Sequence, residues 1–153
     1  MDDWSKAGRI AAEVLEYGKK LIKIDESVLS IIEKIESKTK SLGGEPAFPI
    51  NVSTNHIAAH YTAYKDDKTI FKEGDLVKLD VGVHINGAIG DNAVTIDLGE
   101  NKLLVEASKE ALDEAVKIVK EGLEVREIGR VIQSKIQEHG FAPVINLSGH
   151  RMD

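Results

Sequence analysis

Apolar residues recur every three or four positions in four stretches of the chain, a spacing typical of amphipathic helices. These stretches predict helices over residues 3–22 and 25–41, and two more marked by residues 103–119 and 125–136. Asp25 is the expected N-terminal cap of the second helix, because a carboxylate there can accept a hydrogen bond from a backbone amide. Apolar stripes of this kind indicate core packing and carry no chemistry.

Alternation of apolar and polar residues over residues 76–97 predicts a β-hairpin. Asn86-Gly87 lies at its centre, and this dipeptide is a strong hairpin signal because both turn positions need positive φ. A turn centred there places Gly82 opposite Asp91. Asp80 and Asp91 then share one face as diagonal neighbours, with Cα atoms roughly 7–8 Å apart.

Two interpretations of this face remain open on the residue pattern alone. Two neighbouring carboxylates repel each other unless a positive charge lies between them, which favours a divalent metal or a pair of metals. Alternatively, Asp80 and Asp91 belong, with Lys78 and His84, to the solvated face of a half-exposed hairpin.

Shorter apolar segments predict three further strands. They cover residues 50–53, residues 57–61 after a turn, and residues 141–150 at the end of the chain. His60 follows two alanines, small residues that allow another surface to approach closely. A lone histidine such as His60 is more often structural than catalytic. A second histidine, His150, ends the last predicted strand.

Composition narrows the function classes. The chain has 153 residues, of which 42% are hydrophobic and 30% charged, as expected for one globular domain. A net charge of −6 argues against a general nucleic-acid or anionic-membrane surface. The absence of cysteine excludes disulfides, thiolate ligands and a cysteine nucleophile. With neither a long apolar run nor a signal peptide in the sequence, the expected location is the cytoplasm.

The order of predicted elements repeats along the chain. The first unit, about residues 1–100, reads helix, helix, glycine, strand and hairpin, and the second, about residues 101–153, has the same order without the hairpin. Residues 50–53 (INVS) correspond to residues 145–148 (INLS). We therefore expect residues 1–153 to form an incomplete domain that lacks its C-terminal half. The alternative, a complete domain with a frayed end, stays open.

Three segments in this order resemble type II methionine aminopeptidases, which belong to the creatinase-like "pita-bread" metallohydrolases. They are AFPINVSTNHIAAHYTAY at residues 47–64, KLDVGVHINGAIGD at 78–91 and VINLSGH at 144–150. The short N-terminal region is similar to archaeal members. The resemblance implies an α+β pita-bread fold with an internal pseudo-two-fold repeat, of which the second copy is incomplete here.

The resemblance also implies roles for five residues. Asp80 would bind one metal, Asp91 would bridge two metals, and His150 would bind the other. His60 would contact the scissile peptide, and Phe48 would line the pocket for a methionine side chain. The cofactors would be two divalent ions chosen from Co, Mn, Fe and Zn. The implied reaction is attack of a metal-activated hydroxide on the first peptide carbonyl. It would remove the initiator methionine from peptides and nascent proteins, with the ribosome as a candidate partner.

Four positions depart from the family pattern. Ala63 stands where a proline is usual, Ala88 and Gly90 replace a tyrosine and an alanine, and Asn92 replaces a small hydroxyl residue. These changes concern packing around the ligands and leave the ligands themselves unchanged.

The family completes its site with two glutamates and a second histidine beyond Asp153. We therefore expect residues 1–153 alone to bind metal weakly and to lack useful turnover. The runner-up function is a non-catalytic pita-bread protein that binds partners or ribosomes. The joint presence of Asp80, Asp91 and His150 disfavours it.

Overall fold

The computed structural model describes residues 2–150, which fold as two units that divide after Glu100. The first unit contains α1 (Asp3–Leu21), α2 (Val28–Ser41), β1 (Glu45–Pro46), β2 (Asn51–Thr54), β3 (Leu76–Ile85) and β4 (Ala88–Asp97). The second contains α3 (Lys102–Ile118) and α4 (Val125–Glu138). The predicted α+β class is confirmed. Among the described residues, no helix has the length and apolar character needed to cross a membrane.

The starts of the first two helices are set by side-chain caps. Asp2 precedes α1, and its Oδ1 accepts a hydrogen bond of 2.7 Å from the amide of Ser5. The Oγ atom of Ser27 caps α2 in the same way, at 3.3 Å from the amide of Ser30. The prediction of Asp25 as this cap is wrong. Asp25 has a φ of 69°, and its amide donates to the carbonyl of Phe71 at 2.9 Å, so the helix cannot begin there.

The central hairpin has the predicted register. Asn86 and Gly87 both have positive φ, 51° and 92°, and Gly82 lies opposite Asp91. The whole of β4 pairs antiparallel with one edge of β3. The opposite edge of β3 is shared, with β2 beside its first half and β1 beside its last residues.

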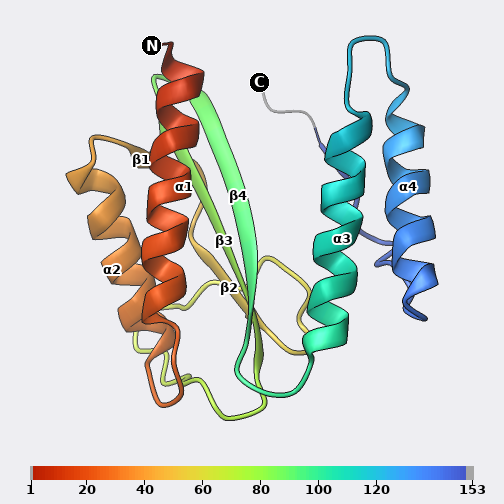
Figure 1. Ribbon diagram of the computed structural model, residues 1–153. Helices are drawn as coiled ribbons and strands as arrows, with labels where there is room; N and C mark the ends of the chain where they lie inside the picture. Colours follow the sequence, from red (N-terminus) through yellow and green to blue (C-terminus); the bar gives the residue numbers. More distant parts are fainter. Residues whose placement is uncertain (1, 151–153) are drawn as a thin grey trace. The chain divides into compact units, whose positions relative to one another are not determined.

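Helices α1 and α2 pack on one face of this sheet, and α1 runs along the β3–β4 hairpin (Figure 1). The odd-numbered residues of β3 face them, and Leu79, Val81 and Val83 are fully buried. The cluster between helices and sheet forms the core of the first unit. Its remaining buried members are Ala7, Ile10, Ala11, Val14, Ile22, Val28, Ile31, Ile32, Ile35, Ile50, Val52, Phe71, Val77 and Ile85. The even-numbered residues of β3 therefore point away from the helices.

Two predicted strands are wrong within the described residues. Residues 57–61 are not a strand, because His60 has a φ of 68° and the bonds of Tyr61 to β2 are not those of a ladder. The carbonyl of Tyr61 accepts from the amide of Val52, but its amide donates to the side chain of Ser53. Residues 141–150 also lack strand structure. Val144, Ile145 and Leu147 are exposed, Ile145 to 94%, and the described part of the chain offers them no strand with which to pair. An extended segment without a neighbour leaves its backbone groups unpaired and gains little stability.

In the second unit, α3 and α4 lie side by side. Three buried alanines, Ala107, Ala111 and Ala115, form the contact stripe of α3. The predicted end of α4 is confirmed, because His139 follows its last residue and Gly140 has a φ of 78°. Positive φ suits glycine, which has no Cβ to clash with the backbone.

Candidate metal centre and substrate face

Asp80 and Asp91 lie on the sheet face that points away from α1 and α2. Asp80 is in the middle of β3 opposite Ala93, and Asp91 is on β4 opposite Gly82, so the two carboxylates are diagonal neighbours. Both residues are partly buried. The predicted sharing of one face is confirmed, while metal ligation by either carboxylate stays a prediction.

Phe48 covers this face directly beside the two aspartates. A Cβ atom built on Gly82 would lie 2.2 Å from Cε1 of Phe48, so the ring occupies the space where a side chain would begin. The loop that carries Phe48 is fixed from both sides. The amide of Ala47 donates to the carbonyl of Gly82 at 3.0 Å, and Nδ2 of Asn51 donates to the carbonyl of Pro49 at 2.6 Å. An apolar ring is thereby held against the carboxylate face, which is where a substrate pocket would need it.

His60 is carried by residues 55–64, which we call the histidine arm. The arm begins at Asn55, whose carbonyl accepts a 2.8 Å bond from Nζ of Lys78. It then follows the outer edge of β2, where the amide of Val52 donates to the carbonyl of Tyr61 at 2.7 Å. His60 itself is exposed. Since β2 separates the arm from β3, His60 lies about two strand spacings, roughly 10 Å, from the strand of Asp80.

Lys78 contributes a positive charge to the same face of β3 as Asp80. Burial lowers the pKa of its ammonium from the ordinary value. It bonds to the histidine arm and lies two residues before Asp80 on β3, so it holds the arm beside the strand that carries this carboxylate.

His84 also faces this side of the sheet, and the sequence prediction treated it only as part of a solvated face. Its Nδ1 atom is buried and has no hydrogen-bond partner among the described residues. The buried Gly82 and this buried ring nitrogen do not fit a fully solvated face. No sequence signal distinguishes His84 from an ordinary polar strand residue.

A hydrogen bond between Tyr61 and Asp67 is a feature that the sequence pattern did not predict. The phenol of Tyr61 lies 2.5 Å from Oδ2 of Asp67, which is only 6% exposed. The available signal was Asp67 two residues before Thr69, the spacing of an Asx-turn, in which an aspartate bonds a nearby backbone amide.

The donor set fits part of a metal site. Two carboxylates without thiolate suit hard or borderline divalent ions. His150, the third predicted ligand, belongs to the second unit, where it is exposed in a segment without regular structure. Within residues 2–150, no group of three or more histidine, aspartate or glutamate side chains is close enough to hold a metal. The ligand role of His150 stays a prediction.

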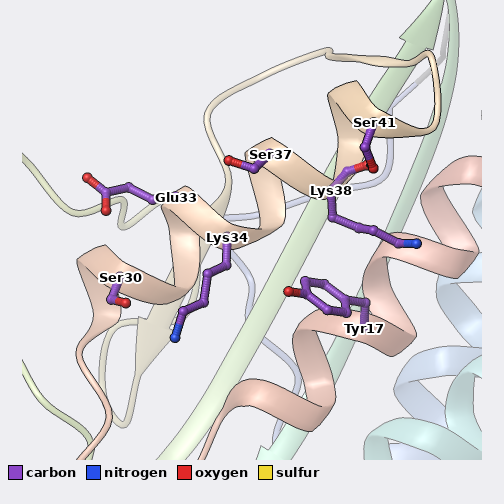
Figure 2. Close-up of a pocket in the computed structure, with 7 residues that line it drawn as sticks. All are labelled: Tyr17, Ser30, Glu33, Lys34, Ser37, Lys38 and Ser41. Carbon is purple, nitrogen blue, oxygen red and sulfur yellow. The ribbon is translucent and has the colours of Figure 1, made fainter.

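A surface groove of about 490 Å³ lies on the helical side of the first unit (Figure 2). It is lined by Tyr17, Ser30, Glu33, Lys34, Ser37, Lys38 and Ser41. Lys38 already pairs with Glu13 at 2.8 Å and stacks over the ring of Tyr17. Because α1 and α2 cover the sheet face opposite to Asp80 and Asp91, this groove is separate from the carboxylate face.

The fold and this face define an α+β protein of the pita-bread-like class. The sequence profile of metallopeptidase family M24 matches residues 2–153, and the chain belongs to this family. Membership implies dependence on metal; the number and identity of the metals stay predictions.

Individual relatives agree with this assignment. The chain is 49% identical over its full length to a methionine aminopeptidase of Pyrococcus horikoshii, and covers 52% of that protein. It is 39% identical to a methionine aminopeptidase of Methanothermus fervidus and covers 89% of it. The crystal structure of a methionine aminopeptidase from Thermotoga maritima superposes with a TM-score of 0.90 at 31% identity, over 97% of this chain and 64% of that one. The chain thus spans about half the length of the Pyrococcus relative.

Proposed function

We propose that this chain contributes the Asp80–Asp91 wall of a methionine aminopeptidase, an enzyme that removes the N-terminal methionine from peptides and nascent proteins. The observation that carries the proposal is the packing of Phe48 on Gly82, opposite Asp91. This packing places an apolar surface beside paired carboxylates. An enzyme that cleaves the peptide bond next to an apolar side chain needs both, one to bind the side chain and the other to hold the metal. Identity of 49% over the whole of this chain, which covers 52% of a protein named for this activity, supports the proposal.

In this proposal Phe48 contacts the methionine side chain, since its ring already lies over the strand that carries Asp80. His60, an exposed residue of its arm, donates a hydrogen bond to the scissile carbonyl. A donor aimed at the oxygen where negative charge develops is typically worth a factor of 10²–10³ in kcat.

Asp80 and Asp91 would be ligands for divalent ions, and His150 stays a predicted ligand. When bound, such ions would polarise the carbonyl and lower the pKa of a water molecule towards neutrality. The protein's part is to fix the carboxylates. The hairpin register and the contact of Gly90 with the backbone of α1 hold Asp91 in place.

The test is an aminopeptidase assay of the complete gene product with Mn²⁺ or Co²⁺ and a Met-Ala-Ser peptide. We expect metal-dependent release of methionine that Asp91→Asn reduces by at least 100-fold, in line with the loss of a metal ligand. Asp97→Asn is the matched control, because Asp97 lies on the same face of β4 but six residues, roughly 20 Å, further along. Absence of metal-dependent release would refute the proposal and favour a non-catalytic binding protein.

We also propose that the two units are structural repeats. Each has a helix pair followed by a glycine of nearly the same φ, 80° at Gly43 and 78° at Gly140. In the first unit the segment at residues 50–53 continues into β2 and pairs with β3. The corresponding residues 145–148 would pair with an equivalent hairpin in a protein as long as the Pyrococcus relative. Amide exchange at residues 145–148 tests this: protection in the complete gene product supports the repeat, and unprotected amides there contradict it.

We propose a cytoplasmic location and action on chains emerging from the ribosome, because N-terminal methionine is introduced by translation. The acidic net charge of −6 argues against tight binding to ribosomal RNA, so any association is expected to be transient. Cell fractionation tests the location. Stable, salt-resistant co-sedimentation with ribosomes would contradict the expectation of transient contact.

A further inference from the structure

Tyr61 is fixed at three separate atoms. Its amide donates to Oγ of Ser53 at 3.1 Å, and its carbonyl accepts from the amide of Val52 at 2.7 Å. Its phenol donates to Oδ2 of Asp67 at 2.5 Å. The first two bonds tie the backbone of Tyr61 to β2, and the third ties its side chain to the segment after the arm.

Asp67 is held as firmly as the tyrosine. Its Oδ1 accepts a 2.7 Å hydrogen bond from the amide of Thr69, and its own amide donates to the carbonyl of Tyr64 at 3.1 Å. The hydrogen bonds from Thr69 and then Tyr61 lower the pKa of the carboxyl, and the bond to Asp67 raises the pKa of the phenol. The pair is therefore a phenol donating to a carboxylate, and such charge-assisted bonds are the stronger kind.

The residue immediately before this fixed tyrosine is His60, which has a φ of 68°. A residue with a Cβ atom seldom adopts this left-handed conformation, and it persists only where the surroundings determine the backbone. His60 is exposed, so its own side chain is not buried in a way that would impose the conformation. The restraint must come from its neighbours in the chain, and Tyr61 is the neighbour that is fixed.

We propose that the Tyr61–Asp67 hydrogen bond is a clasp that positions His60 for its contact with the substrate. The inference rests on the proposed function of His60 and adds two positioning residues to it. Without the clasp, the backbone at His60 can relax to negative φ and the imidazole turns away from the scissile carbonyl.

Tyr61→Phe is the direct test, because it removes only the hydroxyl and keeps the ring and both backbone bonds. Tyr64→Phe is the matched control: Tyr64 is on the same arm, and its side chain is 69% exposed. In the complete gene product with Mn²⁺ we expect Tyr61→Phe to lower kcat on the order of 10-fold, with a smaller change in KM. Asp67→Asn, which weakens the same bond from the other side, is expected to do the same, and Tyr64→Phe is expected to have no effect.

A double-mutant cycle separates positioning from general stability. If the clasp acts through His60, Tyr61→Phe has no further effect on kcat in a His60→Ala background. An equal loss in both backgrounds would overturn the proposal.

A second readout does not depend on activity. In the 153-residue chain, the ¹⁵N heteronuclear NOE of the His60 amide is expected to fall in Tyr61→Phe and to stay unchanged in Tyr64→Phe. An unchanged NOE in Tyr61→Phe would overturn the clasp. If the wild-type complete gene product releases no methionine, the proposed function is wrong. An unchanged NOE in an active protein overturns only the clasp, so the two failures are distinguishable.

Discussion

Replacing Gly82 with alanine tests how Phe48 is held over the carboxylate face. The added Cβ atom would lie 2.2, 2.6 and 2.7 Å from three ring atoms of Phe48, which are the nearest atoms to it. Carbon atoms in ordinary contact are about 3.5–4.0 Å apart, so the ring must move by more than about 1 Å. Overpacking of this kind typically costs about 1–3 kcal/mol.

The double mutant isolates the cause of that cost. In a Phe48→Ala background the ring is absent, so Gly82→Ala should be close to neutral. The coupling energy between the two substitutions is therefore expected to be about 1–3 kcal/mol. If Gly82→Ala costs the same in both backgrounds, the contact between Phe48 and Gly82 is not the reason for the glycine.

Trp4 gives a specific signal for this experiment. It is the single tryptophan of the chain and lies on α1, in the first unit. Its fluorescence in a urea titration follows unfolding of that unit, whereas circular dichroism also reports the helices α3 and α4. The free energy of unfolding from Trp4 fluorescence should agree with that from hydrogen exchange of the β3 and β4 amides. Such agreement would establish that the measured transition belongs to the unit that carries Phe48.

Three further predictions concern the same unit. Gly90→Ala should lower the free energy of unfolding of the first unit by about 1–3 kcal/mol in urea titrations. The new Cβ would lie 2.7 Å from backbone atoms of α1, which cannot rotate away as a side chain can. A neutral effect would show that α1 shifts freely. Ser27→Ala should cost about 1 kcal/mol through loss of the α2 cap. Asp25→Gly, which keeps a residue suited to the positive φ, should cost much less, and the reverse order would contradict the observed helix start. Asp67 has a lowered pKa, so its bonds stabilise the native state above the ordinary value of 3.8, and that stability is lost as pH falls through the native pKa. Asp67→Asn should therefore show a weaker loss of stability than the wild type as pH falls below 3.8. Identical pH profiles would contradict this.

Local chemistry made the hairpin predictable. Asn86 and Gly87 both tolerate positive φ, and this turn sets the register over ten residue pairs, including Gly82 opposite Asp91. The placement of both aspartates on one face follows from that register and the two-residue period of a strand.

Features set by distant contacts were not predictable in the same way. The start of α2 depends on the bridge between Ser27 and Ile70, which holds the preceding residues out of the helix. The conformation of His60 depends on Tyr61 and on its bond to Asp67, six residues later. Sequence patterns report local preference, and these restraints come from tertiary contacts that override it.

Residues 141–150 illustrate a related limit. Their β-forming apolar residues predicted a strand, but a strand is stabilised by the neighbour with which it pairs. The described residues contain no such neighbour for them, and Val144, Ile145 and Leu147 are exposed. The pattern indicates what the segment can do when a partner is present.

The resemblance supplied what physical reasoning left open. The two interpretations of the carboxylate face, metal site or solvated surface, were not separable from the spacing of Asp80 and Asp91. Membership of family M24 and its implied metal dependence favour the first interpretation.

Titration of the ¹⁵N-labelled 153-residue chain with Mn²⁺ measures ligation by Asp80 and Asp91 most directly. A bound paramagnetic ion broadens nearby amide resonances even when binding is weak, as we expect for a chain with this partial ligand set. We expect the amide resonances of Asp80, Gly82 and Asp91 to broaden first. Asp80→Asn and Asp91→Asn should abolish this effect, while Asp97→Asn should preserve it. Broadening centred elsewhere, or unchanged in both aspartate variants, would contradict the assignment of the metal site.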